Sequence, residues 1–299
     1  MIAAHPVDAL GLIDRGAREG IPGVLITLVG IEGTSSRAIG TQMAVLSDGR
    51  QIGSFSGGCI ERAISAEALE VLAQGRARTV RYGIGSPYID VRLPCGGGID
   101  LLFTPQPDAT LVARALARLA RRQPAQLPLG DHVQHYAPPL RLIALGHGED
   151  LLALVRLARA FGIAVDAYAP AQDSTPDEGV LPLVTRTHLP AITGDAWTAI
   201  VFVFHDRDWE EFLLPQALAL TAFYHGAVGS RRTHQARLEK LRASGVPETA
   251  IDALRGSIGL IPATRNPATL ALSILAELVQ DYEACAGSAV WHPGSALRA

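Results

Sequence analysis

The chain has 299 residues, of which 48% are hydrophobic and 18% are charged. This length exceeds the usual size of one domain, so we expect two compact units, each with enough apolar material for a buried core. The 26 basic residues stand against 29 acidic ones and leave a formal charge of -3. The overall charge therefore offers no attraction for nucleic acid or an anionic membrane, and any anion site must be local.

Cysteine usage and the start of the chain predict a reducing compartment. There are three cysteines, Cys59, Cys95 and Cys285, which are too few for a disulfide framework, and an odd number cannot all pair. The segment that begins at Met1 lacks the basic start and unbroken apolar stretch of a signal peptide. No run approaches the ~18 apolar residues of a membrane span. We therefore expect a cytoplasmic protein without an integral membrane segment.

The first half of the chain predicts a mixed α+β domain. Short apolar runs indicate strands, an Asp48-Gly49 pair indicates a tight hairpin turn, and apolar residues at helical spacing follow the loop Ser56-Gly57-Gly58-Cys59. That loop therefore opens a helix. The expected strands are 24–30, 41–46, 51–55, 79–82 and 99–103, and the expected helices are 60–74 and 110–122.

A segment rich in proline and glycine with little periodicity, residues 124–139, predicts a linker. After it, a strand, a glycine turn, a helix and a second strand follow in the order typical of a doubly wound parallel sheet, the Rossmann-like type of α/β domain. We assign an N-terminal domain to 1–123, the Rossmann-like domain to 140–285 and a tail to 286–299. The expected strands are 140–145, 163–168, 199–204 and 223–228, with helices at 151–161, after each of the last two strands, and at 266–283.

Two glycine-rich loops of the first half each carry a cysteine. Cys59 opens a helix after two glycines, where free N–H groups and the helix dipole favour a thiolate, although a small buried residue is the plain alternative. Cys95 heads Cys95-Gly96-Gly97, where backbone N–H groups can converge on an anion or approach a flat ligand, although such loops are also common as turns. The two cysteines are not spaced as a zinc site, and soft thiolates suit molybdenum or sulfur chemistry.

The glycine turn of the second half is an incomplete dinucleotide fingerprint. Gly146 and Gly148 match its first two glycines, but Leu151 stands where the third residue is normally glycine or alanine. The acid expected at the tip of the next strand is replaced by Ala169, and Asp166 lies three residues earlier. The pattern supports the fold and disfavours NAD(P) as a ligand.

Two further groups follow strands of the second half. His205 comes at the carboxyl end of the strand 199–204, where open α/β sheets place ligand groups, although a histidine there can also cap a turn. Ser230 is a candidate helix N-cap followed by Arg231 and Arg232, which resembles a small phosphate site. The alternative is a solvated basic first turn, but basic residues at this end oppose the dipole.

In order, these motifs resemble the XdhC/CoxI family. The resemblance spans nearly the whole chain and rests on Gly33-Thr34-Ser35-Ser36-Arg37, on Gly53 to Glu61 with its Gly-Gly-Cys, on Cys95-Gly96-Gly97, and on Tyr224 to Arg232, Ile258-Gly259-Leu260 and Pro267 to Glu277. The chain departs from the family pattern at Ser36, where a proline is more usual, at Pro94, at His147 and at Ile261-Pro262.

The resemblance implies an accessory chaperone without net turnover. It would bind molybdenum cofactor (molybdopterin), protect it during sulfuration and help insert it into a molybdenum hydroxylase such as xanthine dehydrogenase. The cofactor-binding residues it implies lie in the two Gly-Cys loops, the Gly146 turn, His205 and the Ser230 turn, with Cys59 and Cys95 as metal ligands. A homodimer and a cysteine desulfurase partner are further expectations.

An NAD(P)-dependent oxidoreductase is the alternative, with the Rossmann-like domain binding a dinucleotide and His205 acting as acid or base. Ala169 and Leu151 count against it. A non-catalytic adaptor, in which this domain only docks a partner, is a third reading.

Overall fold

The computed structural model describes residues 5–58, 60–86, 96–205 and 208–289. The chain divides into two compact units, Met1–Pro138 and Pro139–Ala299, which are described separately. The expected fold class, an α+β unit followed by a Rossmann-like unit, is confirmed. None of the described helices is both long enough and apolar enough to cross a membrane.

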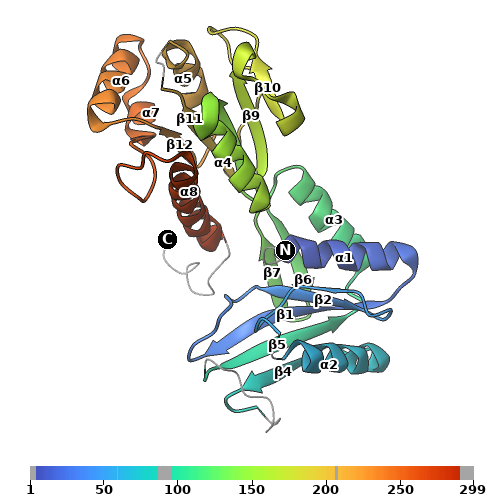
Figure 1. Cartoon of the computed structure of the whole chain (residues 1–299). Helices are drawn as coiled ribbons and strands as arrows, with labels where there is room; N and C mark the ends of the chain where they lie inside the picture. The colour runs from blue at the N-terminus through green and yellow to red at the C-terminus, as the bar shows by residue number, and fades with distance from the viewer. Residues whose placement is uncertain (1–4, 59, 87–95, 206–207, 290–299) are drawn as a thin grey trace. The chain divides into compact units, whose positions relative to one another are not determined.

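The first unit is built on an antiparallel sheet in the order β3-β2-β1-β5-β4. Its strands alternate side chains between two faces, and both faces are covered (Figure 1). One face packs on α2, and the other packs on α1, α3 and the hairpin β6–β7. The elements are α1 (Pro6–Glu19), β1 (Gly23–Glu32), β2 (Gln42–Leu46), β3 (Gln51–Ile52), α2 (Glu61–Gln74), β4 (Arg78–Gly83), β5 (Gly98–Pro105), α3 (Ala109–Ala120), β6 (Ala125–Leu129) and β7 (His132–Tyr136).

The segment 124–139, expected to be a linker, instead forms the hairpin β6–β7. Its inward residues Leu127, Leu129 and Tyr136 are buried in the same core as α1 and α3. The hairpin was not predicted because the segment contains prolines, which are rare inside strands. Proline is nevertheless tolerated at a position in a strand that pairs on one side only. Pro128 occupies such a position in the two-stranded sheet.

A chain of buried polar groups ties this hairpin to the main sheet. The Gln42 amide donates to the Thr27 hydroxyl at 2.9 Å, and the Tyr136 hydroxyl donates to Gln42 Oε1 at 2.9 Å. Burial raises the pKa of Tyr136, so its phenol stays protonated and able to donate. Because a buried polar group without a partner destabilises the fold, the network favours the one position of the hairpin against the main sheet in which these groups are paired.

Two other elements differ from expectation in the first unit. The helix α1 was not predicted, because its N-cap is His5 rather than one of the usual small polar caps; His5 Nδ1 accepts from Val7 N, and Asp8 completes the capping box. The strand β3 ends at Ile52 rather than at residue 55, because Gly53 turns with φ of 97° against the backbone of Gln42 and Met43.

The second unit has a six-stranded parallel sheet in the order β10-β9-β8-β11-β12-β13. Counted along the chain this is the Rossmann order 3-2-1-4-5-6, in which the order of the strands reverses between β8 and β11 while the strands stay parallel. The strands are β8 (Arg141–Gly146), β9 (Ala164–Pro170), β10 (Val180–Leu183), β11 (Thr198–Val203), β12 (Tyr224–Ala227) and β13 (Leu254–Gly256). The helices are α4 (Gly148–Ala160), α5 (Glu210–Leu218), α6 (Arg231–Ala243), α7 (Glu248–Ala253) and α8 (Pro267–Ala289).

Helices of the second unit cover its sheet in two groups. Residues of α5, α6 and α7 share one core with the central strands, whereas α4 packs on β8 and β9 and alongside α8. Asn266 caps α8 as expected, accepting from Ala268 N at 2.9 Å. The helix continues to Ala289, so the expected tail at 286–299 begins inside a helix.

We expect Tyr136→Phe to lower the free energy of unfolding by about 1–2 kcal/mol, because Gln42 Oε1 loses its buried donor. Urea denaturation of the whole chain measures this. Val133→Ala, at an exposed site in the same strand, is the matched control and should change stability by less than about 0.5 kcal/mol. Equal losses in both variants would contradict a specific role for the buried network.

Candidate functional site

Three loops of the first unit converge at one end of its sheet. The strand β1 ends where β5 begins, with Glu32 paired to Gly98, so the loop after β1 lies beside the loop before β5. A Cβ atom on Gly97 would lie 2.1 Å from the Thr34 carbonyl oxygen, which shows how closely these two loops approach. The third loop is residues 53–58, which precedes α2.

Side chains of the loop at 33–37 hold the loop at 53–58. The Ser36 hydroxyl donates to the Phe55 carbonyl at 3.1 Å, and Arg37 Nε donates to the Ser54 carbonyl at 3.1 Å. The family motif Gly33 to Arg37 therefore has a structural role here: it carries donors to a neighbouring glycine-rich loop.

The carboxylate of Glu61, the first residue of α2, organises the Gly-Gly-Cys loop. Its Oε1 accepts from the Ser54 hydroxyl at 2.8 Å, from Phe55 N at 3.0 Å and from Ser56 N at 2.8 Å. Its Oε2 accepts from the Ser56 hydroxyl at 2.9 Å and from Gly58 N at 2.7 Å. The backbone N–H groups of Phe55, Ser56 and Gly58 are thus engaged by an acid of the chain itself.

These hydrogen bonds change the ionisation of Glu61. Partial burial acts to raise the pKa of this carboxyl, but the hydrogen bonds from Ser56 and Ser54 outweigh burial and lower the pKa from 4.5 to about 2. Glu61 is therefore charged throughout the physiological range, and its charge at the start of α2 also suits the helix dipole.

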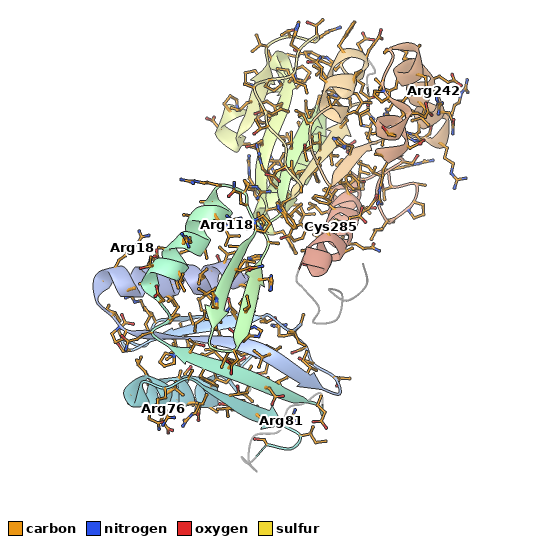
Figure 2. The ribbon with its side chains drawn as sticks, turned by 180° about the vertical axis from the view of Figure 1, so that it is seen from behind. Arg18, Arg76, Arg81, Arg118, Arg242 and Cys285 are labelled. Atoms are coloured by element: carbon orange, nitrogen blue, oxygen red, sulfur yellow. The ribbon has the colours of Figure 1, made fainter. Side chains whose placement is uncertain are left out.

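A charged cluster lies at the same end of the sheet. The guanidinium of Arg81 donates to both carboxylate oxygens of Asp100 at 2.9 Å and to Glu32 at 2.5 Å. Gly30 leaves room for this cluster, since a Cβ there would lie 2.6 Å from Asp100 Oδ2. Figure 2 shows Arg81 near the end of β4. The cluster joins β1, β4 and β5 at the edge where the loops meet.

The predicted residues of the two Gly-Cys loops fall partly within this end of the sheet. Ser56 and Gly58 bind Glu61, Gly57 is exposed, Gly96 is exposed and Gly97 is buried against Thr34. Cys59 and Cys95, the predicted metal ligands, lie outside the described residues. Among the residues that are described, no three His, Cys, Asp or Glu side chains are grouped so as to hold a metal ion.

The second candidate site is the carboxyl edge of the parallel sheet. Gly146 ends β8 against β11, where a Cβ would lie 2.4 Å from the Val203 carbonyl oxygen. Gly148 opens α4 with φ of 70°, a conformation that favours glycine. The two glycines of the incomplete fingerprint thus shape a tight turn at the point where strand order reverses.

Acidic groups occupy the start of α4. Its first turn contains Glu149 and Asp150, and Asp150 Oδ2 lies 2.7 Å from His205 Nε2. The Asp150 side chain is only 14% exposed and that of His205 is 67% exposed. The His147 ring lies 6.0 Å from the His205 ring. His205 is thus held by an acid at the reversal point, and the negative charge there disfavours a pyrophosphate.

The start of α6 has the opposite charge. Ser230 caps this helix by accepting from Thr233 N at 3.1 Å, as predicted. Arg231 and Arg232 follow and are exposed, and the first turn contains no acid. Within the described part of the chain neither guanidinium forms an ion pair, so both are available to an anion.

In the described strand β9, no acid stands at the tip where a dinucleotide site places its ribose-binding acid. Ala169 is buried near the tip of β9, as the sequence indicated. Asp166 accepts from Arg141 Nε at 2.8 Å, and Arg141 is the first residue of β8, so this pair lies toward the amino edge of the sheet. Asp166 therefore has a structural role, which is to pair with Arg141 across β8 and β9.

Sequence reasoning missed three carboxylates with organising roles: Glu61, Asp150 and Glu277. Glu61 ends the family motif that begins at Gly53, and its position three residues after Gly58 was the one available signal. Glu277 accepts from the Tyr224 hydroxyl at 2.8 Å and from Gly259 N at 2.5 Å, which explains structurally three positions of the family pattern. The partners of Asp150 and Glu277 lie far away in the sequence, so no local pattern marked them.

Comparison with known proteins shows which family and which relatives this chain resembles. Residues 17–83 match the XdhC and CoxI family, and residues 142–278 match the XdhC Rossmann domain. The chain is 35% identical over 287 residues to the molybdenum cofactor insertion chaperone PaoD of Escherichia coli (strain K12), covering 88% of this chain and 86% of PaoD. It is 26% identical to the uncharacterized protein YqeB of the same organism, over 91% of this chain and 46% of YqeB.

A solved structure shares the fold. A chain described as a xanthine dehydrogenase of Bacillus halodurans superposes with a TM-score of 0.72 at 21% identity, covering 94% of this chain and 96% of that one. The fold is thus that of a two-unit protein with a glycine-rich first unit and a Rossmann second unit. The chain belongs to the XdhC/CoxI family, which confirms the resemblance seen in the sequence.

We expect the hydrogen bonds of Glu61 to make stability depend on acid. Because folding lowers the pKa of this carboxyl from 4.5 to about 2, its stabilising contribution is full above pH 4.5 and is lost as the pH falls toward 2. The free energy of unfolding of the wild type minus that of Glu61→Gln should shrink by about 1–2 kcal/mol across this window, after allowing for solvent screening. Urea titrations at several pH values test this, and a constant difference would contradict it.

We expect Gly97→Ala to lower the free energy of unfolding by about 1–3 kcal/mol, because the added methyl group meets the backbone of Thr34 and Glu32. Gly11→Ala, inside α1 with only an ordinary contact to Arg15, is the control and should be neutral or stabilising by about 0.5–1 kcal/mol. Thermal and urea denaturation distinguish the two, and a neutral Gly97→Ala would argue against close contact of the loops.

Proposed function

We propose that this protein is an accessory chaperone that binds molybdenum cofactor, protects it during sulfuration and helps insert it into a molybdenum hydroxylase of the xanthine dehydrogenase type. The observation that carries the proposal is the 35% identity to the chaperone PaoD over 88% of the chain. The role is delivery of a cargo, without net turnover.

The converging loops of the first unit suit the metal-bearing part of this cargo. Gly57, Gly58 and Gly96 are exposed and present no side chain, so a flat group can approach their backbone closely. Cys59 and Cys95 follow Gly58 and precede Gly96 in the chain, and their thiolates are the soft ligands that molybdenum accepts. We assign the two cysteines to the metal or to its sulfur.

The start of α6 suits a phosphate. Ser230 presents the helix N-terminus, and Arg231 and Arg232 add two charges that no described acid neutralises. By contrast, Glu149 and Asp150 repel an anion from the start of α4. We therefore assign phosphate recognition to the Ser230 turn, and we assign to Gly146, Gly148 and His205 contacts with uncharged or donor-bearing edges of the ligand.

The same role implies partners. The receiver is a molybdenum hydroxylase, and a cysteine desulfurase is the proposed source of sulfur. We also propose a homodimer that works in the cytoplasm. Binding of NAD(P), the alternative function, is opposed by Ala169 at the strand tip and by the acidic first turn of α4.

Anaerobic titration of the apo-protein tests the proposal. Bound molybdenum and pterin are measured after gel filtration, with NAD and NADP titrated in parallel. We expect stoichiometric binding of molybdenum cofactor and none of either dinucleotide. Binding of a dinucleotide alone would replace the chaperone with the oxidoreductase, and partner binding without any cofactor affinity would favour the adaptor.

Variants then test the assigned residues. We expect Cys59→Ser and Cys95→Ser each to reduce cofactor retention with the fold intact, whereas Cys285→Ser, on α8, is the control and should retain it. Arg231→Ala and Arg232→Ala should each raise the Kd about tenfold, equivalent to about 1.4 kcal/mol. Arg76→Ala removes one exposed charge just after α2 and should leave the Kd unchanged (Figure 2). Full retention by both cysteine variants would remove their ligand role.

A further inference from the structure

The Gly-Gly-Cys loop has the form of an anion-binding loop that is already filled. Three backbone N–H groups, those of Phe55, Ser56 and Gly58, point at the two oxygens of one carboxylate. The hydroxyls of Ser54 and Ser56 donate to the same carboxylate. Successive N–H groups that converge in this way bind phosphate in other glycine-rich loops. Here Glu61 supplies the anion from within the chain.

Both neighbours of Cys59 are tied to this carboxylate. Gly58 N donates directly to Glu61 Oε2 at 2.7 Å. On the other side, Ile60 N donates to the Ser56 hydroxyl at 3.2 Å, and that hydroxyl donates to Glu61 Oε2. Gly57 N is held by the Ser54 hydroxyl at 2.9 Å, which in turn donates to Oε1. The backbone hydrogen bonds on both sides of the cysteine therefore lead to one carboxylate.

We propose that Glu61 is a positioning residue: its carboxylate takes the place of a bound phosphate, fixes the Gly-Gly-Cys loop and keeps other anions out of it. The proposal deepens the chaperone function proposed above and rests on it for the identity of the cargo. On this proposal the loop meets the cargo through the exposed Gly57 and Gly58, and the phosphate of the cargo binds elsewhere.

Glycines make this dependence strong. Gly57 has φ of 75° and Gly58 has φ of 125°, and neither has a side chain that packs to hold the backbone. Without the carboxylate, the donors would turn to water and the loop would sample other conformations, since glycine restricts the backbone least. A loop that samples other conformations should retain the cargo less well, because a small displacement of a binding group of the protein weakens binding strongly.

Chemical rescue of the full-length chain tests the proposal. Glu61→Ala removes the carboxylate, and formate supplies one of similar size. The matched control is Glu70→Ala, which removes an exposed acid from the same helix. Two properties are measured with and without formate: hydrogen exchange at the amides of Ser56 and Gly58, which needs no cargo, and the rate at which loaded protein releases molybdenum cofactor.

We expect Glu61→Ala to lose amide protection at Ser56 and Gly58 and to release the cofactor roughly tenfold faster than the wild type. Formate should restore both properties in this variant and change neither in Glu70→Ala. Inorganic phosphate should likewise protect these amides in Glu61→Ala. It should not protect them further in the wild type, because the Glu61 carboxylate already accepts their hydrogen bonds. Glu61→Asp, which keeps a carboxylate, should retain part of the protection.

Three results would overturn the proposal: wild-type amide protection in Glu61→Ala, formate effects that are equal in both alanine variants, or protection of the wild-type loop by phosphate. If Glu61→Ala does not fold, Glu61→Gln, which keeps the shape and one acceptor oxygen, is measured in the same way. If the wild type binds no molybdenum cofactor, the proposed function fails, and the exchange measurement still decides the role of Glu61.

Discussion

A loop that is open enough to admit a ligand must still satisfy its backbone donors, and in this protein one carboxylate does so. Glu61, the first residue of α2, accepts hydrogen bonds from Ser54, Phe55, Ser56 and Gly58. Ser36 and Arg37 then anchor the same loop to the end of β1. The Gly-Gly-Cys loop of the first unit is thus held by an internal carboxylate as well as by the burial of Phe55 and Ile60 in the core.

Charge distinguishes the two helix starts at the carboxyl edge of the second unit. Both α4 and α6 follow strands of one parallel sheet and present free N–H groups there. The acids of α4 complement its dipole, and one of them holds His205, whereas the arginines of α6 oppose its dipole. A Rossmann fold usually binds its phosphate at the first of these helices, and in this chain the charges favour the other.

Buried polar contacts also join distant segments within each unit. Gln42 and Tyr136 lie 94 residues apart and fix the hairpin to the first sheet. Glu277 on α8 joins Tyr224 on β12 to the loop at Gly259, and Arg255 lies over the Tyr224 ring. Some residues that mark the family in the sequence, such as Tyr224, Gly259 and Glu277, therefore stabilise the fold.

The sequence by itself determined the class of fold, most strands and helices, the cap at Asn266 and the family. Apolar periodicity and glycine position report local burial and local backbone conformation, and these are properties of short segments. Only the tertiary structure decided that 125–136 is a hairpin of the first unit, that Glu61 fills the Gly-Gly-Cys loop, and that Asp150 holds His205. Each of these depends on which donor meets which acceptor after folding, and a hydrogen bond between distant residues leaves no period in the sequence.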